Sequence, residues 1–265
     1  MKTIKAAMCQ IFSLDGDRRG NFVRIENAIG EAKEAGADIA CFPETVILGW
    51  VNPDAHKRAC SIPGADSDRL CRLAADYDIH LCVGLEEKDG RRLYDSAVLI
   101  DNTGQILLKH RKINILAELM RPPYTPGEGV GAVETGFGKV GLLICADTHE
   151  SKILKRMAAL KPDLLIVPYG YAAEEDEWPG HGKQFLKVIR NTARKTAAFV
   201  VGTNLVGEIT KGPWKGRVYG GQSVAVDKTG RTIAIAKDRD RDINIVTINI
   251  DRQAPKIHVP KQLPR

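Results

Sequence analysis

The chain has 265 residues and a mass of 29.0 kDa, and 43% of its residues are apolar while 27% are charged. This composition is typical of a folded globular protein and excludes a disordered or fibrous one. The net charge of +6 comes from 39 basic and 33 acidic residues that are largely interleaved. Because the densest basic patch, Lys109–Lys112, contains no aromatic residue, the charge indicates a solvated surface and no nucleic-acid partner.

Neither a membrane span nor a secretion signal is recognisable in the sequence. No apolar run approaches the roughly 20 residues that a transmembrane helix needs, and the N-terminal segment MKTIKAAMCQ lacks an apolar signal core. We therefore expect a cytoplasmic protein without a membrane partner. The cysteines have no CxxC spacing and the histidines no HxxxH spacing, which favours free thiols and predicts neither a metal nor another cofactor.

Strand and helix patterns alternate from the N-terminus. Short apolar runs predict strands, and apolar residues spaced at i, i+3, i+4 and i+7 predict helices between them. In chain order, the first half contains strand Ile4–Cys9, helix Asn21–Ala35, strand Asp38–Phe42, helix Asp66–Tyr77 and strand Ile79–Leu85.

The third quarter repeats this alternation. Its elements are strand Val140–Cys145, helix Glu150–Leu160, strand Leu164–Pro168, helix Gln184–Thr196 and strand Ala198–Asn204. Alternation of this kind predicts an α/β fold with helices packed on the faces of sheets.

Two stretches of the sequence resemble each other. Ala97–Leu108 reads AVLIDNTGQILL, and Ser223–Ala234 reads SVAVDKTGRTIA. Each combines two alternating strands with a D-x-T-G turn, which predicts a hairpin. The similarity is either a coincidence of common turn residues or a sign that two related α/β halves form the layers of one sandwich. No Gly/Ser/Pro-rich linker separates the halves, which favours a single domain.

Three reactive side chains lie at or just beyond the ends of predicted strands. They are Glu44 after Cys41-Phe42-Pro43, Lys112 after His110-Arg111, and Cys145 after Gly141–Ile144. Taken singly, each has an ordinary explanation, because Glu44 and Lys112 could be solvated surface residues and Cys145 a core thiol.

In combination, the segments FPET, HRK and GLLICAD, in this order, resemble the carbon–nitrogen hydrolase (nitrilase) superfamily. The resemblance extends from about Ala6 to Ile250 and includes VVGTNLVG at 200–207. It implies a four-layer α-β-β-α sandwich over residues 1–252, followed by a Pro-rich basic tail at 253–265. It also implies a homodimer or higher homo-oligomer and a Glu–Lys–Cys catalytic triad.

The resemblance assigns a role to each triad member. Cys145 would attack an amide carbon and form a thioester, Glu44 would act as general base, and Lys112 would stabilise the oxyanion. The backbone N–H of Ala146 would donate a second hydrogen bond to that oxyanion. Family members often carry another glutamate after the lysine, and either Glu118, the nearer one, or Glu128 fits here. Its role would be to orient Lys112 and the substrate.

Segments between the strand ends should line the substrate pocket, namely Gly49–Pro53, Leu116–Tyr124 and Tyr169–Trp178. Within the last segment we expect Tyr169 and Tyr171 to contact substrate. Its acidic residues either select a cationic substrate or belong to a solvated loop. His149 stands where many relatives carry arginine, so it becomes a further candidate substrate contact.

Several functions remain open at this point. The bond cleaved could belong to an amide, which we favour, or to an N-carbamoyl compound or a nitrile. The sequence is also compatible with a Cys–His hydrolase that pairs Cys145 with His149 or His181, and with an inactive binding protein of the same fold.

Overall fold

The computed structural model describes residues 2–250, which contain two six-stranded sheets. The first sheet has the order β15-β1-β2-β3-β4-β5. Strands β1, β2 and β3 are parallel to one another, while β15, β4 and β5 pair antiparallel with their neighbours. The strands are β1 (Lys2–Gln10), β2 (Ile39–Cys41), β3 (His80–Asp89), β4 (Arg92–Ile100), β5 (Ile106–Arg111) and β15 (Asp242–Ile250).

The second sheet has the order β14-β13-β10-β8-β7-β6, with β7, β8 and β10 parallel. Its strands are β6 (Gly131–Thr135), β7 (Gly138–Leu142), β8 (Leu164–Tyr169), β10 (Phe199–Asn204), β13 (Val224–Val226) and β14 (Thr232–Ile235). A small third sheet joins β9 (Ala172–Ala173), β11 (Val206–Glu208) and β12 (Val218–Gly220).

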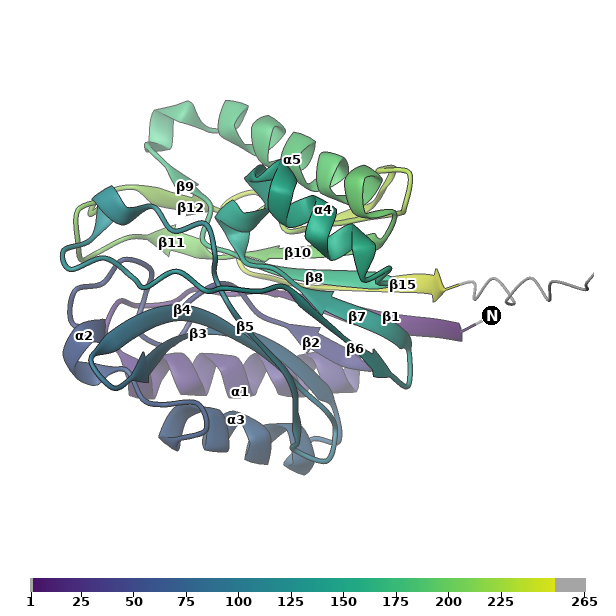
Figure 1. Ribbon diagram of the computed structural model, residues 1–265, viewed down its shortest axis with the longest axis horizontal. Helices are drawn as coiled ribbons and strands as arrows, with labels where there is room; N and C mark the ends of the chain where they lie inside the picture. Colours follow the sequence, from purple (N-terminus) through teal and green to yellow (C-terminus); the bar gives the residue numbers. More distant parts are fainter. Residues whose placement is uncertain (1, 251–265) are drawn as a thin grey trace, which may run out of the picture.

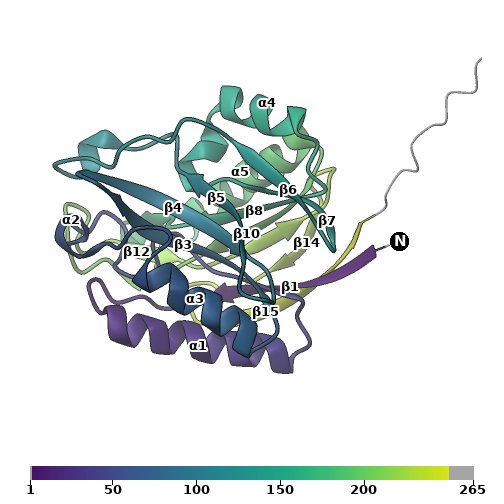
Figure 2. The same cartoon turned by 60° about the horizontal axis from the view of Figure 1, so that its bottom comes forward.

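Helices cover the outer face of each large sheet. Helices α1 (Arg18–Glu34) and α3 (Ala65–Asp76) lie side by side on the first sheet, and α4 (Ser151–Ala159) and α5 (Gly180–Thr196) lie on the second (Figures 1 and 2). The predicted α-β-β-α sandwich is therefore confirmed. The remaining helical elements are α2 (Ala55–Arg58) and three 3₁₀ turns, η1 (Ala117–Leu119), η2 (Cys145–His149) and η3 (Glu175–Glu177). Within residues 2–250, no helix has the length and apolarity to cross a bilayer.

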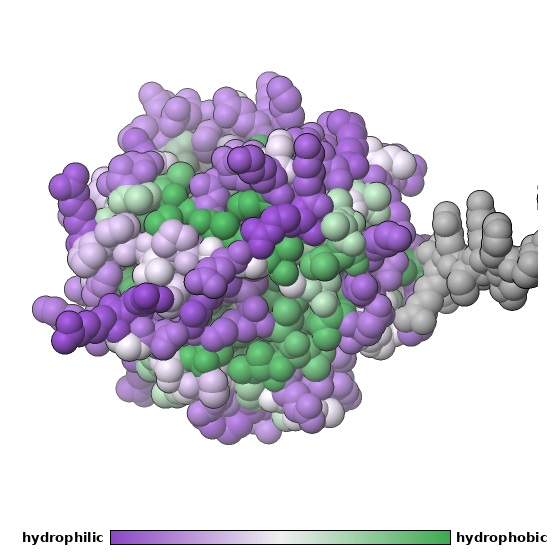
Figure 3. Space-filling view, viewed as in Figure 1, coloured by the Kyte–Doolittle hydropathy of each residue, from purple (hydrophilic) through white to green (hydrophobic). Residues whose placement is uncertain are grey.

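Strand β1 illustrates why the central strands are apolar on both faces. Ala6 and Met8 belong to the core between the two sheets, whereas Ala7 and Cys9 pack with α1. Successive side chains of a strand point to opposite faces, so a strand between two apolar layers loses the polar alternation of a surface strand. Polar side chains cover most of the face in Figure 3, with hydrophobic ones visible between them.

The two D-x-T-G segments form matching hairpins, as predicted. Asp101 joins β4 to β5, and its Oδ1 accepts hydrogen bonds from Thr103 N, Thr103 Oγ1 and Gln105 N. Asp227 joins β13 to β14, and its Oδ1 accepts from Thr229 and Arg231 in the same pattern. Each hairpin has a register irregularity just before its aspartate. The two hairpins lie in opposite sheets of the sandwich.

Element bounds differ from the sequence predictions at functionally relevant places. Strand β7 ends at Leu142 instead of Cys145, because Cys145 adopts a positive φ of 38° and begins the turn η2. Helix α5 starts at Gly180, four residues earlier than predicted. Strand β15 was not predicted and pairs with all of β1. The predicted tail at 253–265 lies outside the described residues.

Candidate active site

The turn η2 presents the thiol of Cys145 beyond the carboxyl end of β7, in the second sheet. A positive φ is unfavourable for a residue with a side chain, and such strain concentrates at functional sites. Hydrogen bonds stabilise this conformation: Thr148 Oγ1 donates to the carbonyl of Cys145 at 2.7 Å, and Tyr169 donates its hydroxyl to Thr148 Oγ1 at 3.1 Å. Cys145 is 7% exposed, so the thiol is largely shielded from water.

Asp147 ties this turn to the first sheet. Its Oδ1 accepts the backbone N–H groups of Ile113 and Asn114 at 2.9 and 2.8 Å, just beyond β5. Its Oδ2 lies 2.8 Å from His110 Nε2 and accepts the N–H of Ile144. Burial alone would raise the pKa of Asp147, but the hydrogen bonds and His110 outweigh it and lower that pKa. The carboxylate therefore fixes the position of the nucleophile turn relative to the segment that carries Lys112.

Glu44 lies in the loop after β2 and is fully buried. Its Oε1 accepts a short hydrogen bond from Lys112 Nζ, and its Oε2 accepts the backbone N–H of Gly170 at 2.6 Å. Close packing requires glycine on the neighbouring strand, because a Cβ at Gly84 would lie 2.6 Å from the Cα of Glu44. Both carboxylate oxygens are therefore held in fixed directions.

Lys112 follows β5 and is 3% exposed. Its Nζ contacts Glu44 Oε1 and also Asp95 Oδ2, at 3.2 Å, and its backbone N–H donates to the carbonyl of Asp95. Burial alone would lower the pKa of Lys112, yet the two carboxylates raise it well above its ordinary value. The ammonium group therefore stays charged inside the protein.

The Cys145 thiol lies within the electrostatic reach of both groups. Burial raises its pKa well above the ordinary value, and the Glu44 charge adds to that effect, while Lys112 and the Gly170 N–H oppose it. The structure therefore brings Glu44, Lys112 and Cys145 together. A thiol in this environment stays protonated until a neighbouring base accepts its proton.

A cavity of about 230 Å³ opens onto the thiol. Its wall is mainly apolar and aromatic. The ring of Tyr171 stacks between His149 and His181, with centroid distances of 6.4 and 4.4 Å. Burial lowers the pKa of both histidines, which favours their neutral forms. The lining residues are Trp50, Asn114, Leu116, Cys145, Ala146, His149, Gly170, Tyr171, Ala172, His181 and Trp214.

Three of the four predicted substrate contacts, Ala146, His149 and Tyr171, line this cavity. Tyr169 does not line it, because its side chain is buried beneath η2 and bonded to Thr148. All three predicted loop segments contribute to the cavity. The acidic residues at 174–177 lie outside it, and Glu174 forms an ion pair with Arg217 at 2.8 Å.

Neither candidate for the second glutamate lies at the lysine in this structure. Glu118 is exposed on η1 and Glu128 is exposed before β6. In the described part of the chain, the carboxylates in contact with Lys112 Nζ are Glu44 and Asp95. We did not predict Asp95 from the sequence, although an acidic residue within the apolar strand sequence LYDSAVLI was a usable signal. Trp50 and Trp214 were missed as single residues because only the fold brings their loops together.

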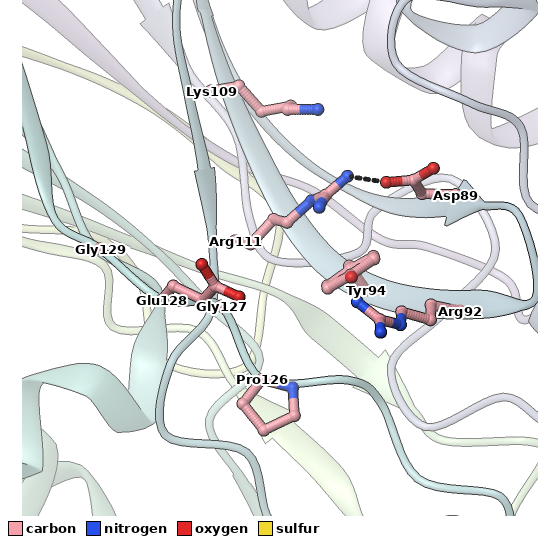
Figure 4. A pocket seen from close by; sticks show the side chains of 9 residues that line it. All are labelled: Asp89, Arg92, Tyr94, Lys109, Arg111, Pro126, Gly127, Glu128 and Gly129. Atoms are coloured by element: carbon pink, nitrogen blue, oxygen red, sulfur yellow. Dashed lines mark hydrogen bonds and ion pairs between the residues drawn. The ribbon is translucent and has the colours of Figure 1, made fainter.

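A second, more polar pocket of about 360 Å³ lies on the outer side of β4 and β5 (Figure 4). There the Arg111 guanidinium lies 3.8 Å from the centroid of the Tyr94 ring and bonds to Asp89 at 2.9 Å. Arg111 and Lys109 also pair with the buried carboxylate of Glu87. No cysteine, serine or threonine among the described residues lines this pocket. Among residues 2–250, no cluster of three or more His, Cys, Asp or Glu side chains is arranged to hold a metal.

Comparisons with known proteins identify related sequences and structures. The sequence model named Carbon-nitrogen hydrolase matches residues 5–255. An (R)-stereoselective amidase of Pseudomonas sp. is 28% identical over 94% of this chain and 86% of its own length. A bifunctional nitrilase/nitrile hydratase of Nicotiana tabacum is 28% identical over 66% of this chain, which spans only 56% of that relative's length.

Solved structures show the same fold. The crystal structure of an amidase from Nesterenkonia sp. has a TM-score of 0.80 and 23% identity, with 94% of this chain and 92% of that chain covered. A mutant of that amidase carries the acetamide moiety of fluoroacetamide, covalently added at its active-site cysteine.

Proposed function

Because the chain belongs to the carbon–nitrogen hydrolase family, we propose that it hydrolyses a small non-peptide amide to a carboxylate and ammonia or an amine. The observation that carries this proposal is the buried Glu44–Lys112 pair beside the Cys145 thiol, at the base of an apolar cavity. The pair supplies a base and a fixed positive charge at the nucleophile, as attack on an amide requires.

In the first half-reaction, Glu44 accepts the thiol proton as Cys145 Sγ bonds to the amide carbon. The carbonyl π electrons move to oxygen, and Lys112 Nζ and the Ala146 N–H stabilise the resulting oxyanion. Glu44 then gives the proton to the leaving nitrogen, the C–N bond breaks, and a thioester remains on Cys145.

In the second half-reaction, Glu44 accepts a proton from water as the water oxygen bonds to the thioester carbon. The same two donors stabilise the second oxyanion. The C–S bond breaks, sulfur regains the proton from Glu44, and the carboxylic acid leaves. One base therefore serves both half-reactions.

The cavity wall favours a neutral acyl group. Its lining contains aromatic and apolar side chains, one asparagine and two histidines that burial keeps neutral, but no acidic, lysine or arginine side chain. A charged acyl group would lose its hydration there without gaining a partner. The acidic loop lies outside the cavity, so this geometry favours the solvated-loop interpretation over selection of a cation.

Nitrile hydrolysis is the second candidate, since nitrilases are among the relatives. We favour an amide because the amidase relative is 28% identical over 94% of this chain, whereas a probable nitrilase of Schizosaccharomyces pombe that matches over a comparable length is 23% identical. A Cys–His mechanism has less support, because the buried carboxylate of Glu44 acts electrostatically on the thiol, whereas the rings of His149 and His181 stack against Tyr171.

We further propose that the protein forms a homo-oligomer of at least two chains and works in the cytoplasm. Light scattering would measure the number of chains in the assembly.

The test is ammonia release from a panel of small amides, N-carbamoyl compounds and nitriles. We expect the highest kcat/KM for neutral amides and a loss of about 10³-fold or more in Cys145→Ala. Cys71→Ala, on the outer helix α3, is the matched cysteine control and should retain activity. Full activity in Cys145→Ala would contradict the mechanism. Absence of turnover across the panel would favour the inactive binding protein.

A further inference from the structure

A row of polar side chains crosses the inner face of the first sheet at the active-site end. Glu86 on β3 lies directly opposite Asp95 on β4, and the backbone N–H of Lys112 pairs with the carbonyl of Asp95. Directly opposed residues of antiparallel strands place their side chains on the same face. Asp95 therefore occupies the middle of this row, between Glu86 and Lys112.

Asp95 is 1% exposed, and the next residues on its face, Ala97 and Leu99, belong to the core between the sheets. Its Oδ2 lies 3.2 Å from Lys112 Nζ. Its Oδ1 is buried and has no hydrogen-bond partner within residues 2–250. A carboxylate ion is acceptor-only and strongly penalised without partners, so the protonation state of Asp95 needs a physical explanation.

The charges around Asp95 do not balance if every group is ionised. Lys112 supplies one positive charge, whereas ionised Glu44 and Asp95 would supply two negative ones in a water-shielded cluster. Burial and the Glu44 charge raise the pKa of Asp95 well above its ordinary value. The other titratable neighbours add no cation: burial likewise raises the pKa of Glu86, and Tyr124 is a buried phenol. Two carboxyl groups that share one cation normally retain one proton.

We propose that Asp95 is a positioning residue that stays protonated through the reaction, holds Lys112 Nζ through its carbonyl oxygen, and leaves Glu44 as the ionised base. This inference rests on the proposed function. The proton that moves in each half-reaction passes between Glu44, sulfur, the leaving nitrogen and water, whereas the Asp95 proton stays in place. An ionised Asp95 would favour a proton on Glu44 and would compete with the oxyanion for Lys112. Asp95 thereby fills the lysine-orienting role that we expected of Glu118.

Two substitutions of Asp95 separate the effect of an acceptor oxygen for Lys112 from the effect of a negative charge. Asp95→Asn keeps a carbonyl oxygen for Lys112 and has no charge, and Asp95→Leu has a similar volume but no acceptor. We expect Asp95→Leu to lower kcat by about 100-fold through misplacement of Lys112, with KM changed by less than about threefold. The kcat of Asp95→Asn should be at least about tenfold higher than that of Asp95→Leu. Asp76→Asn, an exposed carboxylate at the end of α3, is the matched control and should leave activity unchanged.

A pH profile provides a readout that a purely structural role would not change. The acid limb of Cys145 alkylation by iodoacetamide reports ionisation of the base that deprotonates the thiol, and it needs no turnover. If Asp95 is neutral in the wild type, the acid limbs of the alkylation profiles of the wild type and Asp95→Asn coincide within about half a pH unit. Removal of an ionised neighbour would instead shift the limb by about one unit or more.

The possible results lead to different conclusions. Equal losses in Asp95→Asn and Asp95→Leu, unimpaired kcat in Asp95→Leu, or a shifted limb in Asp95→Asn would each overturn the inference. If Asp95→Leu fails to fold, the asparagine variant and its alkylation profile still decide. If the wild type hydrolyses no amide, the proposed function fails, whereas the alkylation profile still tests the protonation state of Asp95.

Discussion

At the residue scale, the position of Cys145 combines exposure to substrate with shielding from water. The thiol lies in a turn and not at the end of a strand, at the point where the buried core meets an apolar cavity. The family resemblance of the segments FPET, HRK and GLLICAD was enough to predict that Glu44, Lys112 and Cys145 belong together. The positive φ and the support from Asp147 were not predictable, because they depend on contacts between the two sheets.

Experiments should distinguish the role of Glu44 as the base from the role of Lys112 in stabilising the oxyanion. Glu44→Gln removes the base, so we expect both amide hydrolysis and iodoacetamide alkylation of Cys145 to slow by about 10²-fold or more. Lys112→Met removes oxyanion stabilisation, so hydrolysis should fall by about 10²–10³-fold while alkylation, which forms no oxyanion, continues. Stopped alkylation in a folded Lys112→Met protein would show that this division of roles is wrong.

His149 offers a test of the neutrality of the cavity. Its ring lines the cavity beside Tyr171, and burial lowers its pKa. His149→Arg would place a permanent charge there, so kcat/KM for neutral amides should fall by about tenfold and that for amides bearing a carboxylate should rise. Kinetics with a matched pair of neutral and anionic amides measures this ratio. An unchanged ratio would mean that His149 does not contact the acyl group.

At the element scale, the matching hairpins were predictable because a D-x-T-G turn forms its hydrogen bonds locally. The β1–β15 pairing was not, because the partners lie at opposite ends of the chain. The role of Asp95 was not predictable either, since it depends on the neighbours of Asp95 on adjacent strands. Loops from distant segments also bring Trp50 and Trp214 to one cavity, an arrangement that no local pattern encodes.

The hairpin aspartates should stabilise their turns equally. We expect Asp101→Ala and Asp227→Ala each to lower the free energy of unfolding by about 1–2 kcal/mol, because each removes three matching hydrogen bonds. The additional ion pair of Asp227 with the exposed Arg231 should contribute little. Hydrogen bonds lower the pKa of Asp227 to about 2. Its stabilisation is therefore present above the unfolded-state pKa of about 3.9 and is lost as the pH falls through about 2. Urea unfolding measures both losses, and a several-fold difference between them would contradict equivalence of the two turns.

At the scale of the whole molecule, the sandwich buries thiols that cannot ionise in place. Burial raises the pKa of Cys9, Cys41 and Cys82 above the ordinary value. Their folded-state pKa exceeds the unfolded-state value of about 8.5, so the stabilisation is complete below that pH and is lost as the pH rises. The free energy of unfolding should fall by up to about 1.4 kcal/mol per thiol for each pH unit above it.

Reversible denaturant unfolding between about pH 7 and pH 10.5 checks this alkaline loss. Cys82→Ala removes one titrating thiol and should reduce the slope with pH, whereas Cys71→Ala, at a partly exposed position, should reduce it less. A flat profile, or equal slopes in the three proteins, would contradict the burial argument.

The central claim is that Cys145 forms a thioester with an amide substrate. Intact-mass measurement during turnover of a small neutral amide tests it directly, with acid quenching to retain the acyl-enzyme. The account predicts a mass increase equal to the acyl group in the wild type, mapped to the peptide containing Cys145 and absent in Cys145→Ala. An adduct on another residue, or amide hydrolysis that persists at the wild-type rate in Cys145→Ala, would contradict it.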